Sequence, residues 1–522
     1  MKQFFFGAAM LFTTIIVDAA EIQKIIFDFK SERQIIHSFG ASDCWRTQYI
    51  GKNWPLEKRE KIADLLFSSE FDEWGNPKGI GLSLWRFNIG SGSHEAEDGG
   101  GISSPWRRTE CFLDNKGNWN WDKQEGQRWM LEAARKRGVK YSLGFSITAP
   151  YFMTKNGMAR ASEKNKYANI REDAYDDYAS FMAEVSDKLG FDYLSPINEP
   201  QWEWVGSNQE GMQATNEECS RLIHFLDNEI SKRSSKTKIV FGEAGDIRYL
   251  YRYGTDKPDR DNQIKEIFSK DGKYSISNLK NVEHVISGHS YWSTWPVDTM
   301  IQTREELYDE IKENLPEFTY WQTEYCPMEK NKDNPNGGGG RDLTMNTALY
   351  VARVIHHDLT VANASSWQWW TAFSEWNYKD GLIFVDDGIL SCGANKGNEK
   401  MIETCKNDGI YRTSKLLWVL GNYSFFVRPG MIRILEKSSV SNNGILASAY
   451  VDFINKKISV VLINNTSKIQ DIDLSFVSVP RKFNTKQFKM YETSDRCDLQ
   501  YKGETGTRFS MPPNSIITLS NK

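Results

Sequence analysis

A short apolar run in the middle of the chain ends in two polar side chains, Asn198 and Glu199, and Pro200 follows directly. Because proline has no backbone N–H and disfavours helical backbone in the residue before it, the run is predicted to be a buried strand with these two side chains at its carboxyl end. Trp202 and Trp204 come next. A carboxyl group beside a flat aromatic surface can protonate a glycosidic oxygen while the sugar stacks on the indole. Taken alone, the stretch is explained equally well as an ordinary strand end with a solvated glutamate.

A second glutamate, Glu324, ends a later apolar run at residues 318–324. In retaining glycosidases one carboxyl group protonates the leaving oxygen, and a second, about 5–5.5 Å away, attacks the anomeric carbon. Two glutamates on opposite sides of one barrel mouth would flank a single glycosidic bond. Glu199 and Glu324 therefore predict this chemistry, provided that the fold brings their two strands to the same cavity.

The elements that must position this pair form a regular alternation. Apolar runs recur at intervals of roughly 45 residues, with helical patterns between most of them. Such an alternation predicts a (β/α)8 TIM barrel, whose active site lies at the carboxyl ends of its strands. Glu199 then ends the fourth strand and Glu324 the seventh. The intervals after Gly242 and Gly288 show the weakest helical pattern. The eight predicted strands are residues 35–40, 81–89, 141–147, 194–198, 238–243, 285–289, 318–324 and 366–370.

A second domain is expected after the barrel. Beyond residue 414 the chain has short strand-like runs, several alternating at period two, separated by Asn, Gly, Pro and Ser. This pattern of short alternating runs predicts an all-β sandwich. The first strands of the mature chain are assigned to the same domain because the barrel offers them no partner. The predicted division is a signal peptide at 1–20, N-terminal sandwich strands at 21–34, the barrel at 35–414 and the C-terminal sandwich at 415–522. The predicted strands are residues 432–436, 445–450, 457–463, 470–476, 487–491 and 508–519.

The first residues have the pattern of an export signal. Lys2 precedes an apolar run at residues 4–17, and the small residues Ala19 and Ala20 follow. The run is too short for a membrane-spanning helix, and no later stretch is long and apolar enough. We therefore expect a secreted or periplasmic protein, cleaved near Ala19 or Ala20, with no membrane span.

Composition excludes other classes. A net charge of −4 leaves no basic surface for nucleic acid. Aromatic residues make up 13% of the chain, including 18 Trp, which fits either a large core or a sugar-binding cleft. The seven Cys are too scattered for a disulfide scaffold, and the chain has no CxxC or HExxH motif. We expect a monomer without cofactor or metal, whose partner is a polysaccharide or oligosaccharide.

Several motifs resemble one enzyme family. The Asn-Glu-Pro after the fourth strand and the Glu at the end of the seventh resemble the clan of retaining glycosidases built on this barrel. Phe-Gly-Ala-Ser at 39–42, Arg-Phe-Asn-Ile-Gly at 86–90, Ala-Pro-Tyr-Phe-Met-Thr-Lys-Asn-Gly at 149–157 and Arg-Pro-Gly at 428–430 resemble glycoside hydrolase family 30. The resemblance covers nearly the whole mature chain. Asn-Glu-Pro-Gln-Trp-Glu-Trp at 198–204 is most similar to the family's endo-β-1,6-galactanases.

The resemblance implies roles for the central residues. Glu199 would be the acid/base and Glu324 the nucleophile. Asn198 would hydrogen-bond the 2-hydroxyl of the sugar. Arg86 would lie beside Glu324 and keep it ionised, although a buried ion pair that only stabilises the core is the alternative. Tyr291 would touch the same carboxylate.

Further candidates are supporting residues. Trp202 and Trp204 are expected to divide between one sugar platform and one packing residue. One of Trp367, Trp369 and Trp370 is expected to floor the sugar site, with Trp369 as the candidate, and the others to be core residues. The end of the first strand offers Asp43 and Trp45 as substrate contacts, although Asp43 is equally plausible as a loop cap. Glu243, ending the fifth strand, is a rival carboxylate that the resemblance places as a supporting residue, and His289 is a weaker candidate of the same kind. Glu203 and Glu375 are similar weak candidates, and His94 is expected on a surface loop.

The predicted function is that of an exported retaining endo-β-glycosidase acting on the β-1,6-linked galactan side chains of arabinogalactan. A β-1,6-glucanase, a xylanase or an exo-β-glycosidase of the same family remains open, since residues 145–150 lack the aromatic that family members often place before the Ala-Pro. Of another class, a carbohydrate-binding protein without turnover would keep the barrel but not need both glutamates. A metal-dependent hydrolase has no ligand cluster in the sequence to support it.

Overall fold

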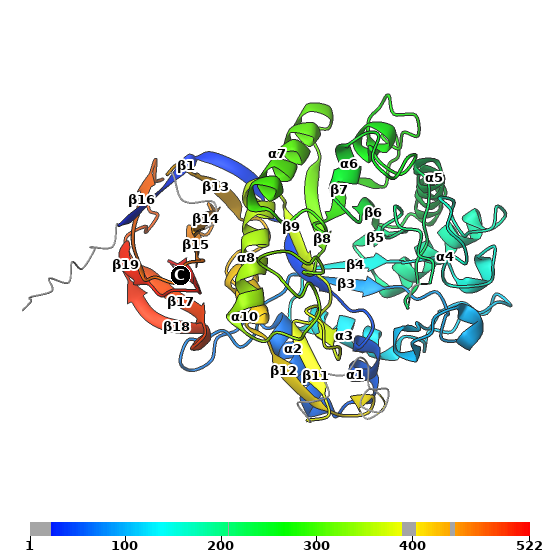
Figure 1. Cartoon of the computed structure of the whole chain (residues 1–522), viewed down its shortest axis with the longest axis horizontal. Coiled ribbons are helices and arrows are strands. Elements are labelled where there is room, and N and C mark those ends of the chain that lie inside the picture. Colours follow the sequence, from blue (N-terminus) through cyan, green and yellow to red (C-terminus); the bar gives the residue numbers. More distant parts are fainter. Residues whose placement is uncertain (1–21, 207, 389–402, 404, 439–443, 522) are drawn as a thin grey trace, which may run out of the picture.

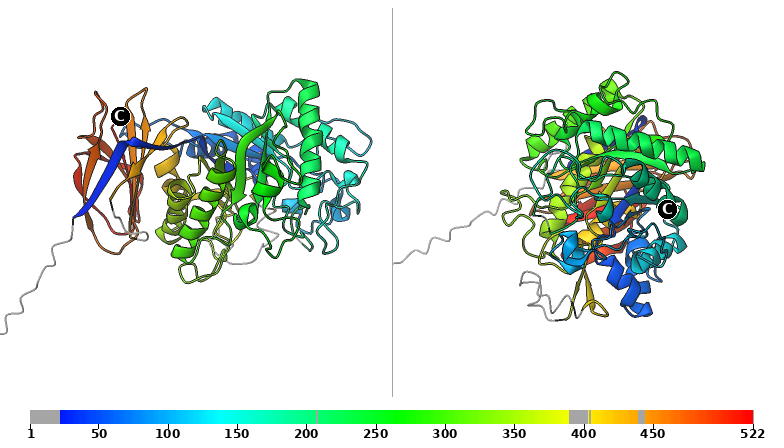
Figure 2. Two further views of the ribbon diagram at one scale, coloured as in Figure 1. Left: turned by 90° about the horizontal axis from the view of Figure 1, so that it is seen from above. Right: turned by 90° about the vertical axis from the view of Figure 1, so that its right-hand side faces the viewer.

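The computed structural model describes residues 22–206, 208–388, 403, 405–438 and 444–521. The predicted signal peptide at 1–20 and Cys392 lie outside these ranges. Two parts stand side by side: a barrel surrounded by helices and a curved β-sheet (Figures 1 and 2). No helix in the described ranges has the length and apolar character needed to cross a bilayer.

The larger part is a closed barrel of eight strands, and every neighbouring pair in it is parallel. The strands are nearly continuous apolar runs because one face packs inside the barrel and the other under the helices. The predicted TIM barrel is confirmed. Its strands, in order around the barrel, are β2 (Ser38–Ser42), β3 (Leu84–Asn88), β4 (Tyr141–Phe145), β5 (Tyr193–Ser195), β6 (Lys238–Ala244), β7 (Val282–His289), β8 (Thr319–Glu324) and β9 (Ser366–Trp369).

Helices follow most of the strands. After Gly242 the weak helical pattern of the sequence reflects a lack of long helices. This interval contains only α6 (Arg248–Tyr251) and a five-residue π-helix at Ile264–Phe268. After Gly288 the helical pattern of the sequence is weak, yet the interval contains a full helix, α7 (Val297–Asn314). It buries only a narrow stripe, so its sequence is mostly polar. The other helices are α1 (Thr47–Asn53), α2 (Leu56–Phe67), α3 (Glu125–Lys136), α4 (Tyr175–Leu189), α5 (Asn216–Arg233) and α8 (Met345–Thr360).

The smaller part is one nine-stranded sheet with its own core, in the order β18-β17-β20-β15-β14-β13-β1-β16-β19. The first strand, β1 (Gln23–Ile35), pairs antiparallel with β13 (Ile432–Glu436) and parallel with β16 (Gln470–Val477). The sheet curls so that Phe476 lies 5.9 Å from Phe488 on the far side. The remaining strands are β14 (Ile445–Asp452), β15 (Lys457–Asn464), β17 (Phe488–Ser494), β18 (Cys497–Thr505), β19 (Arg508–Met511) and β20 (Ser515–Ser520).

The junction between the two parts differs from the prediction at two points. Residues 415–424, expected to open the β-domain, form the helix α10 (Lys415–Ser424), which Ser414 caps by accepting a hydrogen bond from the backbone N–H of Leu417. The helix is buried on nearly all sides between α8 and the sheet, so its apolar run has no helical period to recognise. The single strand predicted at 508–519 is divided into β19 and β20 by two prolines at 512–513. After β9, a small sheet is formed by β10 (Phe373–Ser374), β11 (Ile383–Asp386) and β12 (Ile410–Thr413).

Candidate active site

The carboxyl ends of β5 to β8 bring the polar candidates together at one end of the barrel. Strand β8 ends at Glu324 and β7 at His289. Strand β5 ends earlier than predicted, at Ser195, so Asn198 and Glu199 lie in the loop that follows. The reason is Pro196, which has no N–H to donate to the next strand.

The two predicted catalytic carboxyl groups share one site. An oxygen of Glu199, an oxygen of Glu324 and a ring nitrogen of His289 all lie within 4.8 Å of one another. The exposed fractions are only 6% for Glu199 and 4% for Glu324. A separation of this size is nearer to the roughly 5–5.5 Å between the carboxyl groups of retaining glycosidases than to the roughly 6.5–9.5 Å of inverting ones.

Arg86, fully buried on β3, organises the nucleophile side. Its guanidinium donates to Oε2 of Glu324 at 2.6 Å, to Oδ1 of Asn198 at 2.8 Å and to Oε2 of Glu243 at 2.9 Å. The cation also lies 3.7 Å from the centroid of the Phe145 ring, which blocks its open face. Arg86 is therefore paired with Glu324, the residue predicted to be the nucleophile, and with Glu243.

His289 links the acid/base candidate to a third carboxylate. Its Nδ1 atom lies 2.8 Å from Oε1 of Glu199, and its Nε2 atom lies 2.9 Å from Oε2 of Glu243. Glu243 is fully buried and also accepts from Thr323 at 3.2 Å. It cannot reach substrate, so it is not a rival catalytic group. Tyr291 donates to Oε1 of Glu324 at 3.1 Å.

The charges of this cluster set its protonation. Burial raises the pKa of Glu199. Burial opposes the charge on His289, yet the carboxylates of Glu324, Glu199 and Glu243 raise its pKa to about 10. Glu243 is the converse: burial disfavours its ionised form, but Arg86 and His289 hold its pKa below the usual value. The Glu199–His289 pair therefore retains one proton at neutral pH.

In the described part of the chain, Glu199, His289 and Glu324 are also the set of His, Cys, Asp and Glu side chains with metal-ligand spacing. Their existing contacts argue against an ion. The 2.8 Å between Nδ1 of His289 and Glu199 is a hydrogen-bond distance, and Arg86 already supplies the cation for Glu324. The chemistry of the donors fits proton transfer better than metal binding.

The aromatic candidates divide between two sides of the site. Trp202 is half-buried beside Glu199, since a Cβ on Gly245 would lie 2.2 Å from its indole nitrogen and 3.2 Å from Oε1 of Glu199. Trp204 packs on Gly211 and donates to the carbonyl of Glu199 at 3.2 Å, so it shapes the loop. Of these two tryptophans, Trp202 is therefore the one in position to stack against a sugar.

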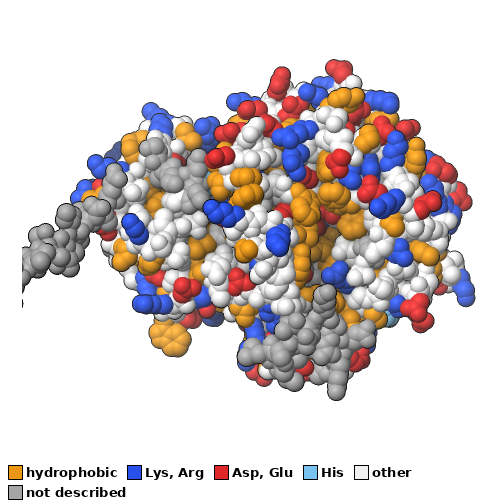
Figure 3. Space-filling model, in the orientation of Figure 1, with side chains coloured by type: hydrophobic (Ala, Val, Ile, Leu, Met, Phe, Trp, Pro, Cys, Tyr) orange, Lys and Arg blue, Asp and Glu red, His pale blue; other side chains and the backbone are white. Residues whose placement is uncertain are grey.

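A cleft of about 600 Å³ lies beside the carboxyl end of β8, where Cys326 lines it. Trp45 and Trp370 are in edge-to-face contact across it, 5.3 Å apart, and Cys326 connects it to Tyr291. In the space-filling view, hydrophobic side chains gather around a hollow in the barrel half of the molecule (Figure 3). The lining of the 600 Å³ cleft also includes Arg107, Gln209, Met328, Trp376, Asn377, Tyr378 and Asp380.

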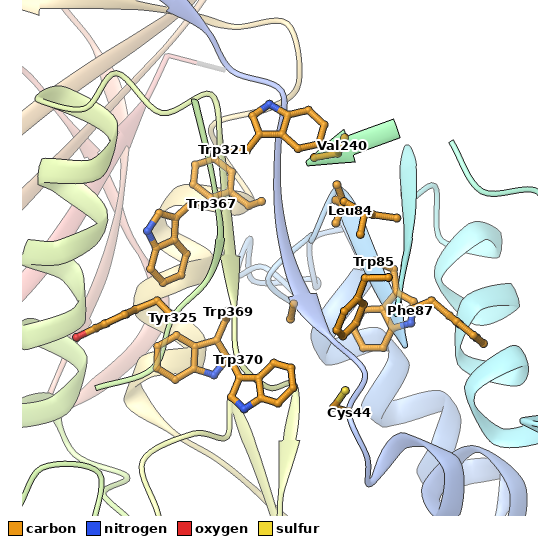
Figure 4. Close-up of a cluster of buried hydrophobic side chains, with 14 of the residues drawn as sticks. Cys44, Leu84, Trp85, Phe87, Val240, Trp321, Tyr325, Trp367, Trp369 and Trp370 are labelled. Carbon is orange, nitrogen blue, oxygen red and sulfur yellow. The ribbon is translucent and has the colours of Figure 1, made fainter. Parts of the chain in front are cut away.

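Two candidates are corrected. Trp369 is fully buried, stacks on Trp367 and donates to the carbonyl of Asp380 at 2.7 Å, so it is a core residue (Figure 4). Its neighbour Trp370 takes the other side of the strand and lines the cleft instead. Asp43 is also fully buried, and both of its oxygens are used, by the backbone N–H of Asn88 and by Gln127. It is the loop cap of the alternative interpretation.

The weaker candidates have structural partners. Glu203 pairs with Arg260 at 3.0 Å, and Glu375 pairs with Arg46 at 2.8 Å. His94 is exposed on a loop, as expected. The site residues that the sequence interpretation missed are Arg107, Phe145, Thr323, Trp376, Tyr378 and Asp380. Only Phe145 and Thr323 carried a signal, as neighbours of strand ends.

Comparison with known proteins agrees with this geometry. The family model described as O-Glycosyl hydrolase family 30 matches residues 22–384. A solved structure titled conserved exported protein from Bacteroides fragilis is 36% identical, with a TM-score of 0.86 over 95% of this chain and 100% of that one. The catalytic domain of GH30 xylanase C from Talaromyces cellulolyticus, 19% identical, shares the fold with a TM-score of 0.65 over 95% and 99% of the chains.

A curated relative, the endo-β-1,6-galactanase of Hypocrea rufa, is 24% identical over 217 residues. That match spans 37% of this chain and less than half, 44%, of the relative. The family match covers far more of the chain and includes every strand of the barrel. The chain therefore belongs to O-glycosyl hydrolase family 30 and is a glycoside hydrolase.

Proposed function

We propose that the protein is a retaining endo-β-1,6-galactanase that works by double displacement. The observation that carries the mechanism is the unequal surroundings of two carboxyl groups in one site. Glu324 faces the Arg86 cation at 2.6 Å, whereas Glu199 faces His289 in a buried setting that raises its pKa. An anion and a proton donor on either side of one bond are what this reaction requires.

In the first step, Glu324 attacks the anomeric carbon while Glu199 gives its proton to the leaving oxygen, forming a glycosyl ester on Glu324. Arg86 and Tyr291 hold the nucleophile by its two oxygens, at 2.6 and 3.1 Å, and orient one lone pair toward the sugar. Asn198 is held by Arg86 and would present its amide to the 2-hydroxyl.

In the second step, the aglycone leaves and water takes its place. Glu199, now ionised, removes a proton from that water, which attacks the anomeric carbon and releases Glu324. His289 is in hydrogen-bond contact with Glu199 throughout and can share the returned proton. Two displacements at one carbon retain the β configuration.

The choice of galactan rests on sequence similarity. Residues 198–204 resemble the endo-β-1,6-galactanases, and the named curated relative has that activity. Trp202 lies next to Glu199, and Trp370 lines the cleft at Cys326, so aromatic surface for more than one sugar is available, which supports action within a chain.

Incubation with β-1,6-galactan, β-1,6-glucan and xylan, followed by chromatography of the products, tests this assignment. A ladder of galacto-oligosaccharides from the first substrate alone is expected, and Glu324→Gln should abolish it. Monosaccharide as the sole product would mean exo action, and turnover of glucan or xylan instead would replace the substrate. Binding without turnover of any polysaccharide would favour the carbohydrate-binding alternative.

Export by cleavage of residues 1–20 is part of the proposal. The N-terminal pattern and the exported relative from Bacteroides fragilis support it. Mass spectrometry of the protein recovered from the periplasm or medium should give a chain that begins near residue 20 or 21. An intact Met1 would contradict export by this route.

A further inference from the structure

The cleft beyond Glu324 contains two charged side chains that the mechanism does not use, Asp380 and Arg107. Both line the same space as Trp370 and Cys326. They come from distant parts of the chain, the loop after β9 and the loop after β3. Their surroundings indicate a binding role.

The backbone of Asp380 is rigidly held. Its carbonyl accepts from the indole of Trp369 at 2.7 Å and from the backbone N–H of Thr371 at 2.6 Å. Its side chain is 5% exposed, and its buried Oδ1 atom has no hydrogen-bond partner in the described structure. Burial raises the pKa of this carboxyl group to about 6, whereas a hydrogen bond from Ser374 and the charge of Arg107 oppose the rise. Oδ1 is the oxygen that can still accept a hydrogen bond from outside the chain.

Arg107 has the opposite charge and a similar lack of polar partners. Its guanidinium lies 4.7 Å from the ring of Trp45 and 5.4 Å from the ring of Trp376. Among the residues that the structure describes, no carboxylate lies within 4.0 Å of it, and its Nε atom is buried without an acceptor. The two aromatic rings orient the cation while leaving its N–H groups available.

The position of the cleft assigns the sugar. Glu199 and Trp202 lie on one side of the scissile bond, where the leaving group must accept a proton. The cleft begins at Cys326, which contacts Tyr291 on the side of Glu324. A sugar attached to Glu324 would have this cleft beside it, two residues along the chain at Cys326.

We propose that Asp380 and Arg107 form a clamp for hydroxyl groups of the glycone, Asp380 accepting from one hydroxyl and Arg107 donating to another. The proposal rests on the proposed function, because it takes Glu324 as the residue that holds the glycone. An acceptor and a donor that face one cleft without meeting match the dual character of sugar hydroxyls. A uronic acid fits less well, because Asp380 would face its carboxylate.

Binding can be measured without turnover. In a Glu324→Gln background, calorimetry with β-1,6-galactobiose and 4-nitrophenyl β-galactoside should give measurable affinity. Adding Asp380→Ala or Arg107→Met should weaken it roughly 10- to 100-fold. Arg107→Lys should restore part of the loss, and Arg135→Met on the outer face of α3 should change nothing. Unchanged affinity in the clamp variants, or no binding of either sugar before they are added, would overturn the clamp.

Kinetics separate the clamp from a structural role and from the proposed reaction. For aryl β-galactosides with different leaving groups, Asp380→Asn should lower kcat/KM by a constant factor, whereas Trp202→Ala should act only when the aglycone is a sugar. A loss in Asp380→Asn that varied with the leaving group would place it on the other side of the bond. Sugar binding without hydrolysis of any β-glycoside would leave the clamp standing and remove the proposed hydrolysis.

A uronyl substrate tests the chemical class. If wild type hydrolysed 4-nitrophenyl β-glucuronide better than the galactoside, and Arg107→Met reversed this preference, the cleft would bind an anionic sugar and the neutral clamp would be wrong. We expect the galactoside to be preferred in both proteins.

Discussion

The Nδ1 atom of His289 lies 2.8 Å from Oε1 of Glu199, the carboxyl group that we propose as the proton donor to the leaving oxygen. The other ring nitrogen is held by Glu243 at 2.9 Å, which fixes the plane of the imidazole. An acid/base residue coupled in this way does not titrate alone. The proton that the reaction needs belongs to the pair.

Replacing His289 with Gln is expected to move the basic limb of the kcat/KM profile to lower pH by about one unit or more. In wild type the neighbouring carboxylates raise the pKa of His289 to about 10, so the pair keeps its proton into the alkaline range. In the variant Glu199 must hold that proton alone. A pH–rate profile with an aryl glycoside measures the shift, and an unmoved basic limb would show that the proton is not shared.

Glu199→Ala should impair natural substrates far more than aryl glycosides with good leaving groups, because only poor leaving groups need the acid. Loss of general acid catalysis is worth about 10²–10⁴-fold. Azide should partly restore turnover of the activated substrate and give a β-glycosyl azide. An α-linked azide from this variant would reverse the roles of Glu199 and Glu324. An activated fluoro-sugar inactivator should label Glu324 and no other residue in a peptide map.

Arg86→Met should lower the free energy of unfolding by about 3–5 kcal/mol, since it leaves Glu243 and Glu324 buried without their cation. The effect should depend on pH. Arg86 and His289 hold the pKa of Glu243 below its usual value, so this carboxylate stabilises the fold at neutral pH and the contribution disappears as the pH falls through that lowered pKa. Urea unfolding of wild type and variant at pH 7 and at several pH values below 4.5 measures it. A difference that stays the same at every pH would contradict this pH dependence.

Trp370→Ala and Trp369→Ala should differ in their effect on KM. Trp370 lines the cleft but is only 8% exposed, so its loss should raise KM and also lower stability. Trp369 is fully buried, and its truncation should cost about 3–5 kcal/mol of stability. Thermal unfolding and kinetics on both variants test the pair. A KM effect confined to Trp369→Ala would restore the original assignment.

Prolonged dialysis against a chelator is expected to leave activity unchanged, because the donors at metal-ligand spacing already satisfy one another and Arg86. The matched control is the same dialysis followed by Mg²⁺, Ca²⁺ or Zn²⁺. Loss of activity that one of these ions restores would assign the cluster to a metal.

Much of this fold is visible in the sequence because burial on two faces leaves continuous apolar runs. The barrel strands were expected within a few residues of where the structure places them. Burial also explains why α10 could not be predicted. Its side chains are buried on nearly all sides of the helix, so the sequence shows no helical period. Strand β5 is shorter than its apolar run because hydrophobicity does not report the missing N–H of Pro196.

The candidate site residues that lie on barrel strands or near their carboxyl ends could be predicted from the sequence. Glu199, Glu324 and Arg86 follow from strand ends and from a family resemblance. Period two separates Trp370 from Trp369, but it does not say which side of β9 faces the cleft. Asp380 and Arg107 lie in loops with no periodic signal, and their proximity depends on how two distant loops pack.

The pairing of β1 with β13 and β16 has a consequence for how the molecule is made. Residues 23–35 are synthesised early, but their partners at 432–436 and 470–477 follow near the end of the chain. The small domain thus cannot assemble until translation is nearly complete, and β1 remains unpaired while roughly four hundred residues are added. A chain that stopped anywhere in the barrel would expose that edge, so truncation products should aggregate where the complete chain does not.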